Sequence, residues 1–492
     1  MKPYYADDRV TVLHGDALDV LRGLPDASVD AVITDPPYGL EFMGREWDAP
    51  WQVSDINADA GMSGTGYTDG GERLPRPSFT GSTNPKCLDC KGTRRGRRDG
   101  TAKVPVCLCE NGGRFPNVRA VEMRAFQSWC ELWTAECLRV LKPGGHLLAF
   151  GGTRTWHRLA CAVEDAGFEM RPSIAWLYGS GFPKSLDVSK AIDKAAGAER
   201  EVVGTTGQRR DLTRNGRTGD EAIRPVYATN VHLDVTAPAT PDAERWQGWG
   251  TALKPSFEPI VVARKPLQGT VASNVLQHGT GALNIDATRI DGRERTDYGL
   301  AKSTRSQGAT YGAPTASADF DSSKGRWPTN VVLDDSQAAE LDQQSGERTS
   351  GARAGGESRD DETDWRFKGG TAKASTGGAS RFFPTFRYEA KAPTSERPRV
   401  NGTAHPTVKP LDLMRWLVRL VTPPGGTVLE PFAGSGTTVE ACIVEGFHCI
   451  AIEREADYLP LIMQRVNRRR DPVAYIKASG DELGLFDLEG LT

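Results

Sequence analysis

The stretch Ile33-Thr34-Asp35-Pro36-Pro37-Tyr38-Gly39 follows an apolar run, Val29 to Ile33, that is interrupted only by Asp30. A short apolar run that ends in turn-forming residues indicates a buried strand. Pro36 and Pro37 cannot donate to a sheet ladder or continue into a helix, so the chain must leave the strand as a stiff, extended turn. We therefore expect this turn to project from the end of a buried strand.

The turn carries three groups that suit a planar ligand with an exocyclic amine. The Asp35 carboxylate and the Pro36 carbonyl can accept the two N–H bonds of such an amine, and the Tyr38 ring can stack on the face of the ligand. The stacking role depends on the ring of Tyr38 and not on its hydroxyl. A strand exit that is stiffened by prolines and carries an incidental aspartate is the alternative interpretation.

A glycine-rich turn follows a second predicted strand, Thr427 to Leu429, near the other end of the chain. Its sequence is Glu430-Pro431-Phe432-Ala433-Gly434-Ser435-Gly436-Thr437-Thr438, and glycines let a backbone approach a ligand closely. The dinucleotide fingerprint requires a third glycine at the position of Val439, so a dinucleotide site is disfavoured. The next predicted strand, Phe447 to Ile452, leads into Glu453, whose carboxylate suits two ribose hydroxyls.

These motifs resemble those of the β class of amino-group DNA methyltransferases, which use S-adenosylmethionine to methylate adenine at N6 or cytosine at N4. Residues 33–39 resemble the catalytic motif and residues 430–438 the cofactor loop, with Glu430 where most relatives carry Asp. His405-Pro406-Thr407-Val408-Lys409-Pro410 resembles the element that approaches the methionine end of the cofactor. The order of the motifs, with the catalytic motif first, also resembles this class, and segments of the middle block look like those of phage and mobile-element members.

The resemblance implies a set of site residues. The catalytic residues would be Asp35, Pro36, Pro37 and Tyr38. Asp16, after the strand Val10 to Leu13, would face the adenine of the cofactor, although it is equally suited to be the N-cap of a helix from Ala17 to Leu24. The cofactor-binding residues implied in this way are Asp16, Lys409, Glu430, Phe432, Gly434, Gly436, Thr437, Thr438 and Glu453.

The alternation of predicted elements indicates an α/β fold. The pattern predicts a strand over residues 146–150, a helix over 155–166 and a strand over 174–178. This strand–helix–strand order indicates a parallel sheet. We expect a doubly wound, mixed but mainly parallel sheet, a Rossmann-like methyltransferase fold in circularly permuted order. Val261 and Val262 are expected at its far edge, and Trp129 and Trp133 of a helix over 121–141 are expected in the core.

The expected organisation has four parts. Residues 8–184 form the catalytic half of the methyltransferase domain, and residues 385–475 form the cofactor-binding half. Residues 185–384 are a loop-rich insertion in which the family keeps its target-recognition region, and residues 476–492 are an acidic tail.

Two local patterns point to further functions. Four cysteines in two close pairs match a structural zinc site, within an insertion over residues 85–112, and the loop 91–98 between the pairs is rich in Lys and Arg, which suits phosphate contacts. Four reduced surface cysteines on a solvated loop are the alternative. Residues 381–388 alternate aromatic and cationic groups, which suits DNA contact or a packed connector. The proposed zinc ligands are Cys87, Cys90, Cys107 and Cys109.

Composition sets wider limits. The chain has 492 residues with 61 Lys and Arg against 64 Asp and Glu, so bulk charge does not indicate a nucleic-acid binder and local clusters must supply any phosphate contacts. The N-terminus lacks the apolar core of a signal peptide, and no apolar run approaches the length of a membrane span. We expect a cytoplasmic protein of a prokaryote or of a phage-infected host.

The resemblance therefore implies a site-specific DNA methyltransferase of the kind found in restriction–modification systems, with duplex DNA as partner and base flipping. Adenine is preferred because Asp35 precedes the prolines, whereas relatives that act on cytosine N4 more often carry Ser. Methyltransferases of RNA or protein glutamine usually carry Asn there and place the cofactor loop first. An inactive DNA-binding accessory would need a decayed cofactor loop. Relatives are often homodimers, which makes a dimer one expectation.

Overall fold

The computed structural model describes residues 2–39, 65–67, 73–75, 118–179, 185–205, 209–210, 230–231, 234–290, 325–350, 375–386, 397–400 and 402–470. The four cysteines of the expected zinc site, the basic loop 91–98 and the tail 476–492 lie outside these residues.

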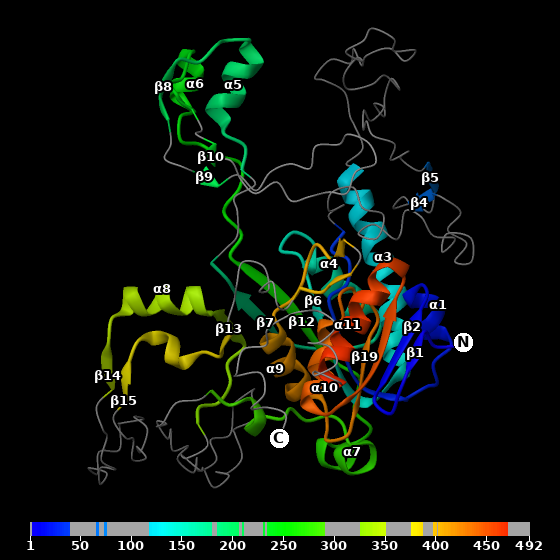
Figure 1. The fold of residues 1–492 in the computed structure, drawn as a ribbon. Helices are drawn as coiled ribbons and strands as arrows, with labels where there is room; N and C mark the ends of the chain where they lie inside the picture. The colour runs from blue at the N-terminus through cyan, green and yellow to red at the C-terminus, as the bar shows by residue number, and fades with distance from the viewer. Residues whose placement is uncertain are drawn as a thin grey trace, which may run out of the picture.

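A ten-stranded sheet forms the centre of the molecule (Figure 1). Strands from both ends of the sequence lie next to each other in it, blue beside red in Figure 1. In spatial order the strands are β1 (Tyr5–Ala6), β2 (Val10–His14), β20 (His448–Glu453), β19 (Thr427–Glu430), β3 (Val29–Thr34), β6 (Leu141–Phe150), β12 (Phe257–Arg264), β7 (Glu169–Leu177), β13 (Val331–Asp334) and β16 (Thr385–Phe386).

The sheet is mixed and mainly parallel. The strands from β2 through β20, β19 and β3 to β6 pair in parallel, and β7, β13 and β16 also pair in parallel. Within this sheet β12 runs antiparallel to both β6 and β7, and β1 is antiparallel to β2. The prediction of a mixed, mainly parallel α/β sheet is confirmed.

Helices cover both faces of the sheet. Within β3, Ala31 and Ile33 pack on one side with α9, α10 and α11, whereas Val29 and Val32 pack on the other side with α1, α3 and α4. Trp133 is 1% exposed in the second layer, so the core placement of the α3 tryptophans is confirmed. The helices that cover the sheet are α1 (Ala17–Arg22), α3 (Val118–Val140), α4 (Trp156–Asp165), α9 (Leu411–Val421), α10 (Thr437–Glu445) and α11 (Leu459–Arg470).

The expectation that Val261 and Val262 lie at the edge of the sheet is wrong. Their strand β12 lies inside the sheet, where Ile260 pairs with Phe150 of β6 on one side and Ile174 of β7 on the other. Both valines are buried, because each packs into the core on one of the two faces of the sheet. The far edge is formed by β16 instead, with β13 between it and β7.

Strand β6 also begins earlier than the predicted start at His146. Leu141 already pairs with Val29, and a register irregularity follows before Ala31 pairs with His146. Gly144 takes a positive φ of 80° within this segment. The Pro-Gly-Gly sequence is thus accommodated as an irregularity inside the strand and not as a break before it.

The remaining described elements lie at the periphery. α5, α6 and β8 stand apart from the sheet in Figure 1. None of the described helices is long and apolar enough to cross a membrane. The peripheral helices are α5 (Val188–Ala196), α6 (Pro241–Arg245), α7 (Val271–His278) and α8 (Asp335–Ser345). The peripheral strands are short and form five pairs: β4 (Thr65–Tyr67) with β5 (Arg73–Pro75), β8 (Val202–Thr205) with β11 (Asp234–Thr236), β9 (Arg209–Arg210) with β10 (Asn230–Val231), β14 (Arg348–Ser350) with β15 (Ser375–Gly377), and β17 (Arg399–Val400) with β18 (Thr403–Ala404).

Asp30, the polar interruption in the apolar run of β3, joins three neighbouring strands. Its carboxylate is buried, with one oxygen 2.7 Å from the Lys142 ammonium of β6. The other oxygen accepts the Thr427 backbone N–H of β19 at 2.8 Å. A buried carboxylate with both oxygens bonded in this way fixes the lateral order of the strands that carry the two motifs.

We predict that Asp30→Ala lowers the free energy of unfolding by about 2–3 kcal/mol, because it leaves the partly buried N–H of Thr427 and the partly buried ammonium of Lys142 without their acceptor. Urea unfolding of the variant measures this loss. The matched change Asp19→Ala, at a side chain that is 72% exposed, should stay within about 0.5 kcal/mol of the wild type. Equal effects of the two substitutions would show that the Asp30 contacts do not hold the strands.

Candidate active site

The two motifs that lie far apart in the sequence meet at one edge of the sheet. β3 and β19 are parallel neighbours, with Val428 opposite Ala31, so both strands end at the same edge. The Thr34 hydroxyl, just before Asp35, donates a 2.5 Å hydrogen bond to the buried carboxylate of Glu430. The proline turn and the glycine turn therefore leave the sheet side by side.

The proline turn is held rigidly by the loop after β6. Thr155, which is buried, donates from its hydroxyl to the Tyr38 carbonyl at 2.7 Å. Gly152 lies against the Tyr38 side chain, since a Cβ there would come within 3.1 Å of the ring. Asp35 and Tyr38 are only half-buried, so the turn presents both side chains at the edge of the sheet.

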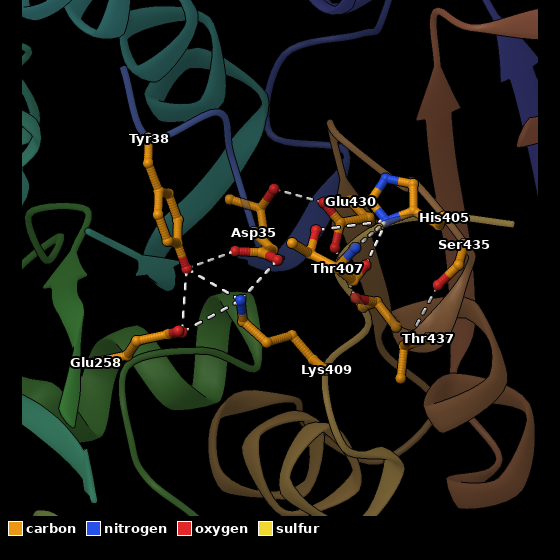
Figure 2. A network of polar contacts seen from close by, with 11 residues as sticks. Asp35, Tyr38, Glu258, His405, Thr407, Lys409, Glu430, Ser435 and Thr437 are labelled. Carbon is orange, nitrogen blue, oxygen red and sulfur yellow. Dashed lines mark hydrogen bonds and ion pairs between the residues drawn. The ribbon is translucent and has the colours of Figure 1, made fainter. Parts of the chain in front are cut away.

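A compact network of charges surrounds this turn (Figure 2). The Lys409 ammonium lies 2.8 Å from Asp35 Oδ2, 3.2 Å from Glu258 Oε2 and 3.0 Å from the Tyr38 hydroxyl oxygen. The Tyr38 hydroxyl lies 2.9 Å from Asp35 Oδ1 and 3.2 Å from Glu258 Oε2. Two carboxylates thus share one lysine and one phenol.

The electrostatics of this network keep Lys409 cationic. Burial by itself lowers the pKa of the Lys409 ammonium, but Asp35 and Glu258 reverse this effect and raise the pKa above its usual value. Burial, followed by the same two carboxylates, raises the pKa of Tyr38 well above its usual value, so its phenol stays protonated. The group as a whole carries two negative charges and one positive charge.

Glu258 is the member of this network that sequence reasoning missed. It follows Phe257 at the start of β12, and an antiparallel strand in a parallel sheet begins at the edge where its neighbours end. The Pro259 carbonyl next to it accepts the backbone N–H of Gly151, just beyond the end of β6. In the sequence, Glu258 is only a single acidic residue before the apolar run 260–263. Its place at this edge of the sheet can be inferred only once the direction of β12 is known.

Lys409, which the resemblance predicts to lie near the cofactor, contacts the proline turn in this structure. It follows β18 and precedes α9, and its ammonium also lies 4.8 Å from the centre of the Phe150 ring. His405 of the same element packs edge-on against Tyr458, with ring centres 4.6 Å apart. Burial lowers the pKa of His405, which favours its neutral form. The element therefore bridges the proline turn and the glycine turn.

The glycine turn has the backbone that its sequence predicts. Gly434 and Gly436 have positive φ values of 53° and 80°, which non-glycine residues adopt only at a cost. A Cβ on Gly434 would meet the His405 ring at 3.1 Å, and one on Gly436 would meet Ile462 of α11 at 3.1 Å. Gly436 is thus also required for helix packing.

The Glu430 carboxylate lies beneath this turn and organises it. It is 2% exposed and accepts hydrogen bonds from the hydroxyls of Thr34 and Thr438 and from the Phe432 backbone N–H. Burial raises the pKa of Glu430 to about 8, against the opposing effect of these three donors. Glu430 therefore has a structural role, because its hydrogen bonds join the proline turn to the glycine turn.

Glu453 ends β20 beside the glycine turn. Its carboxylate accepts the backbone N–H groups of Gly434 and Glu455, each at 2.7 Å. Burial raises the pKa of Glu453 to about 7, although both amides lower it. Each carboxylate oxygen can accept a second hydrogen bond, so Glu453 can still bind a hydroxyl donor.

The remaining predicted cofactor residues have clear structural partners. Asp16 accepts the Leu18 backbone N–H at 2.9 Å and caps α1, which is the alternative role considered for it. Phe432 packs against Trp129 and Trp133 of α3, with ring centres 5.7 and 5.3 Å away. Thr437 is buried, and its hydroxyl lies 3.4 Å from that of Ser435.

Two other predictions fall partly or wholly outside the described residues. The described part of the chain contains no cluster of three or more His, Cys, Asp or Glu that could hold a metal, and the four cysteines of the expected zinc site are not in that part. Of residues 381–388, Phe386 packs on Trp416 with ring centres 5.8 Å apart. Phe382 is 44% exposed between the guanidinium groups of Arg326 and Arg381.

Comparison with known proteins finds one matching family and several relatives. A family model described as DNA methylase matches residues 119–464, well over half of the chain. The type II methyltransferase M.HindIII of Haemophilus influenzae is 23% identical over 276 residues, which cover 56% of this chain and 64% of that enzyme. The type II methyltransferase M.SmaI of Serratia marcescens is 40% identical over 67 residues, 14% of this chain and 23% of that enzyme.

The match therefore spans less than two thirds of the length of either relative. Among solved structures, the PvuII DNA methyltransferase, described as cytosine-N4-specific, aligns over 97% of this chain and 93% of its own, with 12% identity and a TM-score of 0.36.

The pKa of Glu430 leads to a prediction about stability. Below pH 4.5 the carboxyl is protonated in both the folded and the unfolded chain, and it contributes nothing to the pH dependence. Between pH 4.5 and about 8 the folded chain holds a proton that the unfolded chain releases, so stability falls by at most about 1.4 kcal/mol per pH unit. Glu430→Gln is neutral throughout and should lack this loss.

Urea unfolding of wild type and Glu430→Gln at pH 5, 6, 7 and 8 measures the difference. The free energy of unfolding of the variant minus that of the wild type should increase with pH across this window. Effects of Glu453 are common to both proteins and cancel in the difference. A difference that does not change with pH would mean that Glu430 is ionised in the folded chain.

Proposed function

The chain belongs to the DNA methylase family, and we propose that it transfers a methyl group from S-adenosylmethionine to the N6 amine of adenine at specific sites in duplex DNA. The observation that carries this proposal is the contact between Thr34 and Glu430, which places the Asp35 turn beside the glycine turn. A group held by one turn is then within reach of a ligand held by the other. Methylation of cytosine at N4 is the alternative.

The residues around the glycine turn suit the cofactor. S-adenosylmethionine supplies a methyl group that is already activated by a positively charged sulfur. Glu453, with acceptor capacity left on its oxygens, would hold ribose hydroxyls, and the positive φ values of Gly434 and Gly436 shape the turn beside it. The net negative charge of Asp35, Glu258 and Lys409 suits a cationic group nearby.

The proline turn would position the base. In this proposal the flipped adenine stacks on the Tyr38 ring while Asp35 and the Pro36 carbonyl accept its two amine hydrogens. These contacts direct the nitrogen lone pair toward the methyl group, and Asp35 stabilises the positive charge that develops on the nitrogen. The nitrogen–carbon bond forms as the carbon–sulfur bond breaks with its electron pair on sulfur, and one amine proton leaves by way of the Asp35 carboxylate.

Adenine is preferred because of the aspartate itself. The Asp35 carboxylate precedes the prolines, and this residue type is the one that the resemblance associates with adenine. The first and last blocks, 8–184 and 385–475, would together form the catalytic domain, since β2 and β3 of one interleave with β19 and β20 of the other. The block 185–384 would supply target recognition.

We predict that Asp35→Ala reduces methyl transfer to DNA by a factor of roughly 100 or more, because the amine loses its main acceptor. Binding of S-adenosylmethionine, measured by calorimetry, should change much less than turnover, since Glu453 and the glycine turn are untouched. The assay incubates host genomic DNA with labelled cofactor and then identifies the methylated nucleoside by mass spectrometry.

The expected product is N6-methyladenine. N4-methylcytosine in its place would establish the alternative acceptor. Wild-type turnover by Asp35→Ala would contradict the proposed site, and failure of the wild type to bind S-adenosylmethionine would favour an accessory DNA-binding role.

We also propose that Cys87, Cys90, Cys107 and Cys109 hold a structural zinc ion. The support is their spacing in two close pairs, which suits a tetrahedral thiolate site. The basic loop 91–98 between the pairs would then be presented to DNA phosphates.

Elemental analysis of the purified protein should find about one zinc ion per chain. Cys90→Ser should lose most of this zinc, whereas Cys161→Ser, at an exposed cysteine of α4, should retain it. A wild-type protein without zinc, or a Cys90→Ser variant that keeps it fully, would rule out this site.

A further inference from the structure

The Lys409 ammonium is the one group in contact with all three oxygen-bearing side chains of the network described above. Its three N–H bonds face three oxygen atoms, on Asp35, Glu258 and Tyr38. Asp35 is also the side chain that has to accept the target amine in the proposed reaction. Lys409 and the target amine therefore compete for the same acceptor, the Asp35 carboxylate.

Glu258 changes the outcome of this competition. Without it, Lys409 and Asp35 would form a neutral pair, and a buried cation would have a single carboxylate partner. With it, the lysine is shared between two carboxylates at 2.8 and 3.2 Å. One negative charge is then left over in the group, where the attacking nitrogen becomes positive.

The fold fixes Glu258 in this position. Its strand β12 pairs along its length with β7, and Glu258 lies opposite Trp176 in that register. Trp176 is buried and packs edge-on against Phe150, whose ring in turn lies beneath the Lys409 ammonium. The Glu258 side chain is 21% exposed, so little freedom remains to turn it away from Lys409 and Tyr38.

We propose that Glu258 is a positioning residue that holds Lys409 by its second contact, so that Asp35 can exchange its contact with Lys409 for the target amine. This inference rests on the proposed function, since it assigns Asp35 to the amine. Glu258 acts through Lys409 and Tyr38 and does not touch the base. When the base enters, Lys409 keeps its contact with Glu258 while its contact with Asp35 lengthens.

The test is a double-substitution cycle with Glu258→Gln and Lys409→Gln. In the background that contains Lys409, Glu258→Gln should lower kcat by roughly tenfold, the size expected for coupled groups in contact. The KM for S-adenosylmethionine should change less than twofold, because the glycine turn is untouched. In the Lys409→Gln background, the same substitution should cost less than twofold.

Two further variants separate this role from a loss of folding. Glu258→Asp keeps the carboxylate and should recover part of the activity that Glu258→Gln loses. Glu169→Gln makes the same chemical change on β7 opposite Arg264 at the other end of β12 and should keep wild-type activity. Thermal unfolding of each variant establishes that it is folded under the conditions of the assay.

The inference is overturned if Glu258→Gln has wild-type kcat, or if it costs the same factor whether or not Lys409 is present. Either result, combined with normal turnover by the wild type and inactivity of Asp35→Ala, leaves the proposed function in place. A wild-type enzyme that transfers no methyl group would instead contradict the proposed function.

Discussion

A hydrogen bond between the Thr34 hydroxyl and the buried Glu430 carboxylate joins residues that are 396 positions apart in the chain. It forms because β3 and β19 are parallel neighbours whose ends share one edge of the sheet. Glu430 also bonds to Thr438 and to the Phe432 amide, so one carboxylate sets the shape of the glycine turn and its distance from the proline turn. The pairing of these two strands is the constraint on which the proposed site depends.

Two carboxylates with opposite tasks result from this arrangement. Glu430 lies in the interior, where burial favours its neutral form and three donors orient it. Asp35, one residue beyond Thr34, lies at the surface of the sheet edge and bonds to Lys409 and Tyr38. The same edge of the sheet thus holds both carboxylates: Glu430 at the end of β19, with a structural role, and Asp35 after β3, which we propose contacts the substrate. Glu258 and Lys409 connect this pair of turns to the antiparallel strand β12 and to the segment before α9.

Much of this structure could be predicted from local sequence. Hydrophobic runs located β2, β3, β19 and β20, and the residue types at 33–39 and 430–438 identified the two turns. Gly434 and Gly436 have the positive φ values that a glycine turn suggests. The place of β12 could not be predicted, because a short apolar run does not reveal the strands between which it inserts. Glu258 was missed for the same reason, since its position at the edge where the two turns leave the sheet follows only from the antiparallel direction of its strand. The partners of Lys409 were likewise set by long-range packing and not by its neighbours in sequence.

The central claim is that the proline turn and the glycine turn form one site across the β3–β19 boundary. A crystal structure with sinefungin, an analogue of S-adenosylmethionine that carries an amine in place of the transferable methyl group, tests it most directly. We expect the ribose hydroxyls of sinefungin to contact Glu453 and its amine to face the Asp35 carboxylate. Sinefungin bound away from residues 430–438, or bound there with its amine pointing away from Asp35, would contradict the account.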